Sequence, residues 1–345
     1  MRTNDLDYYL PKEQISQQPM SPRTAAKLFV VNRNTGKQEH AHVADLERLI
    51  NENDCLVLNV TSVLRARLFG TATTGSKREV FLIKKIFREN AEENIWEALI
   101  KGSARQGDEI FLDGDISLSV ERNNDDGTFL VSFPIPDEKL QEFLVQHGHV
   151  PVPPYIHREP GSLEYETVYA DPSQRRSVAA PTAGFHLMEE LLASLKEKGV
   201  QIEKVVLDVG LGTFQPVRTE NLEEHKIHSE NIFVSEESAQ RINEAKKQGK
   251  RIVAVGTTTL RVLESVANED GTIKSYSGET SLFITPGYKF KVVDALLTNF
   301  HLPKSSLLAL VAAFIGSVDV TLDIYNEAVK EKYRFFSFGD AMWIE

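Results

Sequence analysis

The chain has 345 residues, of which 26% are charged and 41% hydrophobic, and its formal net charge is −11. That length is about twice a typical domain, so two domains and a large core are expected. The acidic balance excludes a general polyanion binder, because sequence-independent affinity for nucleic acid comes from Lys and Arg. The single cysteine, Cys55, lies in the apolar run "CLVLNV", and we interpret it as a small buried hydrophobe.

The start of the chain, "MRTNDLDYYLPKEQISQQ", has acidic residues and a proline where a signal peptide needs an apolar core. No apolar run approaches the roughly 18 residues of a membrane span. We therefore expect a cytoplasmic protein with no membrane partner. A monomer is the expected state, although the sequence does not fix it.

The first predicted elements are a helix around residues 43–52 and the buried strand "CLVLNV". From about residue 64 to residue 133, strand-like runs follow at roughly ten-residue spacing, separated by turn clusters such as "NNDDG". The runs are "ARLFGTA", "REVFLIKKIF", "NIWEALIK", "DEIFL", "ISLSVE" and "TFLVSF". They predict a small antiparallel barrel or sandwich. Basic residues at 65–67 and 76–88 could form a nucleic-acid face or a strand edge protected by lysines.

A short helix near residues 137–147 and the linker "PVPPY" close this zone. Strands and helices then alternate, which predicts parallel strands flanked by helices. The segments are "QIEKVVLDVG", "SEESAQRINEAKKQGK", "RIVAVG", "TTTLRVLESVA" and the interior helix "SSLLALVAAFIG". The fold class predicted is a discontinuous α/β domain, residues 1–62 and 153–345, with an inserted small antiparallel β-barrel domain, residues 63–152.

Three turns follow predicted strands, at the edge where α/β sheets bind ligands. They are "APTAGFH" (180–186), "DVGLGTF" (208–214) and "VGTTTLRVLE" (255–264). Their glycines allow close backbone approach, and their threonines offer hydroxyl groups. None matches a phosphate loop or a complete dinucleotide fingerprint, so a nucleoside with a small carboxylate tail suits them better. Ordinary tight turns and helix caps are the alternative interpretation.

Two histidines are candidates for chemistry. His186 stands just before a predicted helix, where free backbone N–H groups favour a carboxylate or phosphate; the alternative is a satisfied histidine in a plain turn. His301 precedes Pro303 and is either catalytic or a buried structural residue. The pair His225 and His228 lacks an HExxH motif and cysteine ligands, so a polar loop or substrate contact is favoured over zinc. A serine hydrolase is disfavoured because no GxSxG elbow is present.

Together these segments resemble the S-adenosylmethionine:tRNA ribosyltransferase-isomerases of queuosine biosynthesis. The resemblance covers nearly the whole chain and keeps the order of a dozen motifs. They are "LPKEQISQQP", "LVLN" with "ARLFG", "PVPPYI", "YETVYA", "SVAAPTAGFH", "VGLGTFQPV", "EEHKIHSE", "VGTTTLRVLE", "SGETSLFITPGYKF", "NFHLPKSSLL" and "YRFFSFGDAMWI".

The resemblance implies an α/β domain with an inserted β-barrel. It also implies an enzyme that transfers and isomerises the ribosyl group of S-adenosylmethionine onto 7-aminomethyl-7-deazaguanine at the wobble position of tRNA with a GUN-type anticodon. The products are epoxyqueuosine in tRNA, adenine and methionine. S-adenosylmethionine is a substrate, and no metal or redox cofactor is expected.

Under this resemblance we expect His186, His301 and Glu264 to be the acid and base candidates. Arg261 with the "GTT" backbone would hold the methionine carboxylate, and the "GLGTF" loop would hold the nucleoside. The other expected substrate-binding residues are Arg23, Asn59, Arg67, Tyr169, Thr182, Gly184, Gly210, Gly212, Thr213, Thr257, Thr258 and Arg334.

The chain departs from the family pattern mainly in its N-terminal half. The departures are Thr24, Lys27, Val60, Ser62, Arg65, Glu166, Arg176 and the run Phe185 to Met188. Several remove a charge or a hydrogen-bonding group. Two other readings therefore stay open: a paralogue that binds tRNA or a nucleoside without this turnover, and an enzyme of the same fold with a different substrate.

Overall fold

The computed structural model describes residues 1–345 except 87–93, 114–115, 153–154, 159–160, 162–163, 211–216, 218 and 226. The chain divides into two compact units. The α/β unit comprises residues 1–62, 154–175 and 180–345, and the barrel unit comprises residues 63–153 and 176–179.

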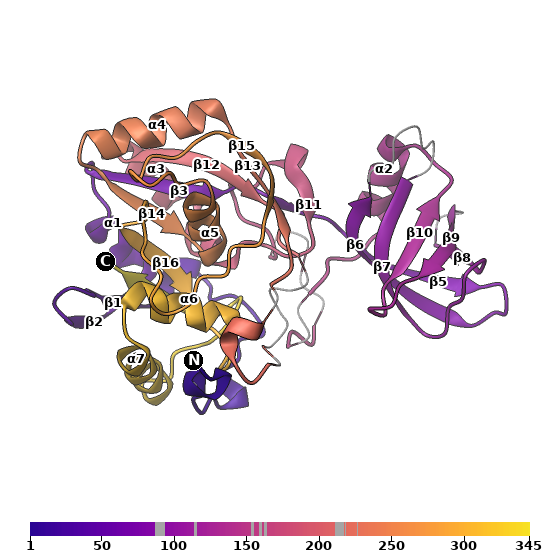
Figure 1. Ribbon diagram of the computed structural model, residues 1–345, viewed down its shortest axis with the longest axis horizontal. Coiled ribbons are helices and arrows are strands. Elements are labelled where there is room, and N and C mark those ends of the chain that lie inside the picture. Colours follow the sequence, from indigo (N-terminus) through magenta and orange to yellow (C-terminus); the bar gives the residue numbers. More distant parts are fainter. Residues whose placement is uncertain are drawn as a thin grey trace. The chain divides into compact units, whose positions relative to one another are not determined.

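The α/β unit is built on a nine-stranded sheet (Figure 1). Its strands, from edge to edge, are β15 (Tyr276–Thr280), β13 (Glu230–Val234), β12 (Gln201–Leu207), β3 (Asp54–Asn59), β14 (Arg251–Val255), β16 (Ala295–Asn299), β17 (Ala341–Ile344), β1 (Lys27–Val31) and β2 (Gln38–His42). The four neighbours β12, β3, β14 and β16 are parallel, as the alternating pattern predicts. The sheet as a whole is mixed, because β13, β15 and β2 pair antiparallel, and β17 is antiparallel to β16 but parallel to β1.

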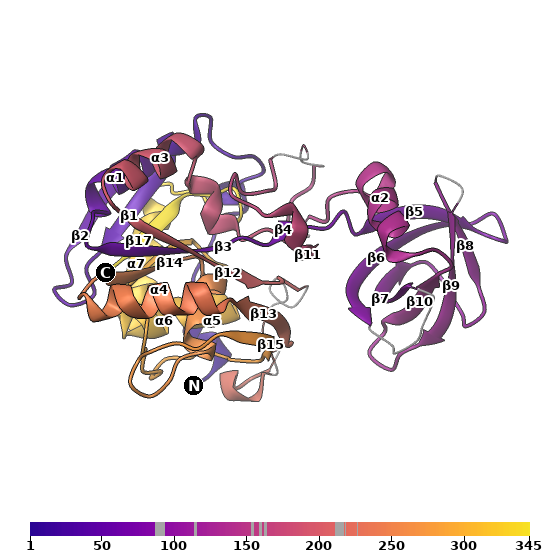
Figure 2. The same cartoon turned by 90° about the horizontal axis from the view of Figure 1, so that it is seen from above.

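Helices cover both faces of this sheet. They are α1 (Leu46–Leu49), α3 (Glu189–Glu197), α4 (Glu236–Lys247), α5 (Thr257–Ser265), α6 (Ser306–Ile315) and α7 (Val318–Lys330). Figure 2 shows α1 and α3 on one side of the sheet and α4 and α5 on the other. The helix predicted around residues 43–52 is shorter than expected, since a 3-10 turn, Val43–Asp45, leads into the single turn of α1.

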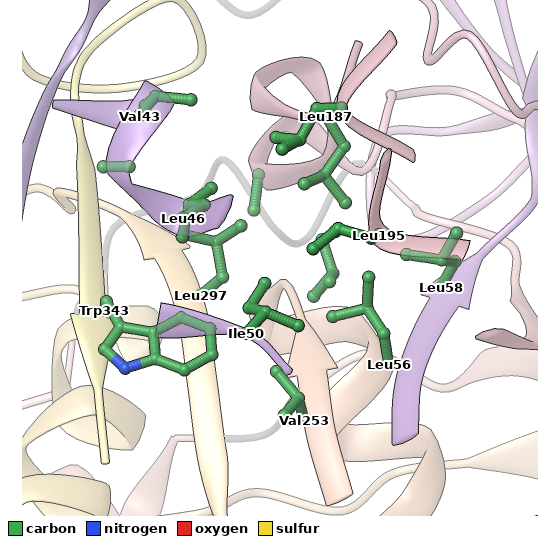
Figure 3. Close-up of a cluster of buried hydrophobic side chains, with 14 of the residues drawn as sticks. Val43, Leu46, Ile50, Leu56, Leu58, Leu187, Leu195, Val253, Leu297 and Trp343 are labelled. Atoms are coloured by element: carbon green, nitrogen blue, oxygen red, sulfur yellow. The ribbon is translucent and has the colours of Figure 1, made fainter. Parts of the chain in front are cut away.

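Side chains of β3 alternate between the two faces, as strand geometry requires. Leu56 and Leu58 join the large apolar cluster beneath α1 and α3, together with Leu195 and Trp343 (Figure 3). The side chain of Cys55 points to the other face of the sheet and is fully buried. Burial is the main cause that raises the pKa of its thiol to about 12. The prediction that Cys55 is a buried hydrophobe is confirmed.

The barrel unit is a closed six-stranded antiparallel barrel, so it leaves no unpaired sheet edge. Its strands are β5 (Arg67–Ala72), β6 (Lys77–Ile86), β7 (Asn94–Lys101), β8 (Glu109–Leu112), β9 (Ile116–Asn123) and β10 (Phe129–Phe133), followed by α2 (Asp137–His147). These are the six strand runs and the helix predicted from the sequence. The predicted fold class, a discontinuous α/β unit with an antiparallel barrel, is confirmed.

Two short strands, β4 (Ser62–Val63) and β11 (Arg175–Ser177), form a separate two-stranded sheet. The interior helix α6 is almost completely buried, as its uniformly apolar sequence predicts. Within the described ranges, no single helix is long and apolar enough to cross a bilayer, and α6 with α7 meets that criterion only as a pair bent by 112°.

Candidate active site

A cavity in the α/β unit opens at the carboxyl ends of the parallel strands. It is lined by Tyr155, Ala180, Pro181, Thr182, Ala183, Val209, Gly256, Thr257, Thr258, Thr298, Asn299, Phe300, His301, Leu302, Ser305, Leu307, Phe336 and Ser337. Ligands of open α/β sheets bind at this edge. All three turns singled out in the sequence contribute residues to the lining. We call this space the main cavity.

Asn299, the last residue of β16, faces the main cavity and contacts two other side chains. Its Oδ1 accepts a hydrogen bond from Thr182 Oγ1 at 3.0 Å, and its Nδ2 lies 3.2 Å from His186 Nε2. Among the described residues that line the cavity, Thr182 is present and His186 is not. His186 therefore stands behind Asn299.

The turn that carries His186 is a 3-10 helix, η6 (Thr182–His186), and α3 begins only at Glu189. The histidine thus ends a turn, and its side chain contacts Asn299. Gly184, in the middle of η6, is required sterically, since a Cβ there would lie 1.9 Å from the Tyr169 hydroxyl. That hydroxyl is buried and has no hydrogen-bond partner among the described residues.

His301 lies in the wall of the main cavity and is held on several sides. Its Nε2 lies 3.0 Å from Thr298 Oγ1. Its backbone carbonyl accepts a hydrogen bond from the Tyr8 hydroxyl, and its backbone N–H donates to the Tyr325 hydroxyl at 3.3 Å. The ring is therefore fixed in position at the edge of the cavity.

Both histidines are neutral at physiological pH. Burial lowers the pKa of His301 to about 3. Burial also lowers the pKa of His186 to about 3, and the positive charges of Arg334 and Arg23 add to the effect. A neutral imidazole has one N–H donor and one acceptor nitrogen, so each ring can accept a proton or a hydrogen bond at one position.

The first turn of α5 supplies Thr257 and Thr258 to the main cavity. Gly256 precedes this turn with a φ of 90°, a conformation that favours glycine. Asn59, at the end of β3, donates from Nδ2 to the carbonyl of Leu207 at 3.1 Å and to Thr258 Oγ1 at 3.5 Å. Asn59 is fully buried, so it connects β3, β12 and α5 instead of lining the cavity.

Arg261, one turn further along α5, lines a second and smaller cavity, which we call the arginine cavity. Its Nη1 pairs with Glu230, and its Nε donates to the carbonyl of Leu282 at 3.2 Å. Its Nη2 is buried and has no partner among the described residues. The other carboxylate oxygen of Glu230 accepts from the backbone N–H of Gly210 at 2.9 Å. Leu307 lines both cavities, so they share a wall.

Glu264 lies still further along α5 and belongs to the described lining of neither cavity. Its carboxylate accepts the backbone N–H groups of Lys291 at 2.9 Å and of Val292 and Val293 at 3.0 Å, and the Tyr288 hydroxyl at 3.3 Å. Both carboxylate oxygens of Glu264 therefore hold this loop.

Two expected arginines surround His186 without lining the main cavity. Arg23 donates to the backbone carbonyl of Phe185 at 3.3 Å, and its guanidinium lies 5.1 Å from the centre of the Phe185 ring. Burial lowers the pKa of Arg23. Arg334 pairs with Asp340 at 3.1 Å. Arg23 therefore contacts the η6 turn, and Arg334 affects His186 through its charge.

Arg67 belongs to the barrel unit. Its Nε pairs with Glu79 at 2.6 Å, and Lys101 Nζ lies 3.9 Å from the same carboxylate. Part of the basic surface expected on β5 and β6 is thus compensated locally. Gly212 and Thr213 lie outside the described residues.

Two departures from the family pattern contact each other. Ser62 donates a hydrogen bond to Glu166, and Arg175 Nε lies 3.5 Å from Ser62 Oγ. Both Ser62 and the neighbouring departure Val60 are buried. These substitutions are therefore accommodated by a local polar contact and by the apolar core.

His228 lines the arginine cavity, and the His225 ring packs edge-on against Phe283 at 5.6 Å. Within the part of the chain that the structure describes, no group of three or more His, Cys, Asp and Glu residues could hold a metal ion.

Sequence reasoning missed Asn299 and Glu230. Asn299 is part of the motif "NFHLPKSSLL", two residues after the apolar run "ALL", and a polar residue at the carboxyl end of a buried strand was the available signal. Glu230 stands in the short strand β13, and its contact with Arg261 in the wall of the arginine cavity makes it part of the site.

The chain matches the family model described as queuosine biosynthesis protein over residues 3–344. It is 46% identical to the S-adenosylmethionine:tRNA ribosyltransferase-isomerase of Thermosipho melanesiensis and 47% identical to that of Clostridioides difficile, each over the full length of both chains. The crystal structure of S-adenosylmethionine tRNA ribosyltransferase from Thermotoga maritima is 37% identical, covers 99% of this chain and 100% of that chain, and gives a TM-score of 0.56. The chain belongs to the queuosine biosynthesis protein family.

Proposed function

We propose that this chain is an S-adenosylmethionine:tRNA ribosyltransferase-isomerase. It transfers and isomerises the ribosyl group of S-adenosylmethionine onto 7-aminomethyl-7-deazaguanine at the wobble position of tRNA, leaving epoxyqueuosine in the tRNA and releasing adenine and methionine. The full-length identity of 46% to 47% to enzymes of that name carries this proposal. The proposed tRNA has a GUN-type anticodon, and the enzyme acts as a cytoplasmic monomer without a metal or redox cofactor.

The nucleoside part of S-adenosylmethionine occupies the main cavity in this proposal. Hydroxyl groups of Thr182, Thr257 and Thr258 surround that space and suit a ribose. The sulfonium group acidifies the adjacent C–H bond, so the reaction needs a base beside the ribose and an acid that helps adenine leave. Expected contacts from Gly212 and Thr213 of the "GLGTF" loop belong to the same proposal.

His301 is the proposed base. It lies in the cavity wall and is unprotonated at neutral pH. With Nε2–H donating to Thr298 Oγ1, the basic nitrogen is Nδ1. His186 acts on the substrate through Asn299, because the carboxamide stands between that ring and the cavity.

The arginine cavity takes the carboxylate of the methionine part. Arg261 Nη2, which has no partner among the described residues, supports this assignment, because a buried donor without a partner costs about 1–3 kcal/mol that an anionic ligand would recover. The shared wall at Leu307 places this cavity next to the main one, as a single extended ligand requires.

The tRNA phosphates are met by basic side chains of the barrel unit. Arg67, Arg78 and Lys84 lie on β5 and β6, in a chain that is acidic overall. Binding through such contacts weakens steeply with salt, because cations are displaced from the RNA backbone.

The test is release of free adenine by the purified chain from S-adenosylmethionine and tRNA bearing the aminomethyl base. We expect adenine and methionine in equal amounts, and none with tRNA that lacks this base. No release under any condition would favour a paralogue that only binds. Release without tRNA would favour an enzyme of the same fold acting on a small substrate.

A further inference from the structure

The described residues use only half of the hydrogen-bonding capacity of the Asn299 carboxamide. A primary amide offers two N–H donors and two lone pairs on oxygen. One lone pair accepts from Thr182 Oγ1 at 3.0 Å, and one N–H faces His186 Nε2 at 3.2 Å. One donor and one acceptor remain on a side chain that lines the main cavity and is only 3% exposed.

The two neighbours bear on which way round the amide points. In the structure the Nδ2 end faces His186 Nε2, which is an acceptor in the Nδ1–H tautomer of that ring. The hydroxyl of Thr182 donates to the oxygen end. Turning the amide by 180° would place its oxygen against the acceptor nitrogen of His186. The remaining donor and acceptor are therefore presented to the cavity in a fixed order.

A fixed N–H and C=O side by side match the edge of adenine. That edge presents an N6 amino donor next to a ring-nitrogen acceptor, and carboxamide side chains recognise it through two hydrogen bonds. Hypoxanthine has an oxygen in place of the amino group, so one of the two contacts would bring two acceptors together.

We infer that Asn299 recognises the adenine ring of S-adenosylmethionine, donating from Nδ2 to a ring nitrogen and accepting from the N6 amino group at Oδ1, with Thr182 and His186 as positioning residues. The inference rests on the proposed function and adds to it the specificity for the base. The deazaguanine of the tRNA is the other purine in the reaction, and experiments without tRNA separate the two.

The experiment measures dissociation constants of S-adenosylhomocysteine and S-inosylhomocysteine by calorimetry without tRNA. Neither ligand has the sulfonium, so neither can react. The wild-type chain is expected to bind the adenosyl ligand roughly 5- to 150-fold more tightly, the range for one good two-bond contact. In N299A the two affinities become similar, because the adenosyl ligand loses its contacts.

Three further variants keep the test independent of folding and of mere structural damage. N299D has nearly the same shape and keeps the oxygen acceptor but has no N–H donor, so both ligands should bind more weakly while the preference for the adenosyl ligand remains. H186F should reduce the ratio of the two affinities, because the amide is then free to turn. N243A is the matched control: Asn243 bridges the backbone of Ile273 with both ends of its amide, away from the described lining of either cavity, and its removal should leave the ratio unchanged.

Equal binding of both ligands by the wild-type chain, or an unchanged preference in N299A, would overturn the role of Asn299 and leave the proposed function intact. Binding of neither ligand would contradict the proposed function itself.

Discussion

Arg261 and Glu230 form an ion pair in which both side chains are only 6% exposed. The pair joins α5 to the strand β13, and the guanidinium keeps one buried nitrogen without a partner among the described residues. A buried pair of this kind is costly to break by removing one partner, since the other charge is then left unpaired, at about 3–5 kcal/mol. The spare nitrogen is what distinguishes it from a purely structural pair.

R261Q is therefore expected to lose affinity for ligands with the methionine carboxylate. S-adenosylhomocysteine has this carboxylate, and decarboxylated S-adenosylmethionine lacks it. The two ligands also differ in the sulfonium, so the affinity of each ligand for R261Q is compared with its affinity for the wild type. The first should bind about 10- to 100-fold more weakly to R261Q, in line with a lost charge-assisted hydrogen bond of about 1.5–3 kcal/mol. The second should bind unchanged.

E230Q is the control for this variant. It removes the ion pair but keeps the guanidinium, so stability should fall while S-adenosylhomocysteine still binds. Equal weakening of both ligands in R261Q would show that Arg261 only supports the fold.

Glu264 is expected to matter for stability and not for proton transfer. In E264Q one oxygen can still accept from the backbone of Val292 and Val293, whereas Lys291 loses its acceptor. The free energy of unfolding should fall by about 1–3 kcal/mol, the cost of an unsatisfied buried group. Urea unfolding measures that loss, and the adenine-release rate should stay within a few-fold of wild type. A rate loss of a thousandfold with unchanged stability would restore a catalytic role.

Gly184 should tolerate no side chain while Tyr169 keeps its hydroxyl. G184A places a Cβ 1.9 Å from that oxygen and 2.8 Å from Thr167 Cγ2. Overpacking of this kind costs about 1–3 kcal/mol. The double variant G184A/Y169F should recover part of the loss in thermal melts, because the nearest clashing atom is gone. If Y169F gave no recovery, the close approach at Gly184 would not be the cause.

The two buried histidines predict a stability that falls in mild acid. In the unfolded chain a histidine takes up its proton below about pH 6.5. In the folded chain His186 and His301 stay neutral down to about pH 3. Protons thus bind preferentially to the unfolded state between these values, so the free energy of unfolding decreases as the pH falls.

Each histidine contributes about 1.4 kcal/mol per pH unit to this slope. Denaturant titrations of the wild type and of H301N at a series of pH values measure this slope. In H301N the slope should be smaller by the contribution of one histidine. A slope in H301N equal to that of the wild type would mean that His301 is not held neutral.

The sequence predicts those parts of the fold that depend on local pattern. The barrel strands alternate apolar and polar residues between turn clusters, and α6 is apolar on every face, so both follow from periodicity. Strand direction at the sheet edges does not, because it depends on how the connections between strands run. The edge strand β15 and its neighbour β13 therefore escaped prediction, and the sheet is mixed rather than parallel.

The candidate site was predictable in outline and not in its contacts. The glycine and threonine turns mark the edge of the sheet where ligands bind, and they do meet at the main cavity. Their sequence cannot show that His186 lies behind Asn299, since that arrangement depends on packing between η6 and β16. The sequence also cannot show that the Arg261 side chain pairs with Glu230 of a distant strand, whereas the threonines of the same helix line the main cavity.

The central claim is that turns at the carboxyl ends of the sheet hold one S-adenosylmethionine. A crystal structure of this chain with S-adenosylhomocysteine tests it most directly. The claim requires the adenosine in the main cavity, within hydrogen-bond distance of Asn299, and the carboxylate at Arg261 Nη2. A ligand bound anywhere else, or in contact with only one of the two residues, would contradict it.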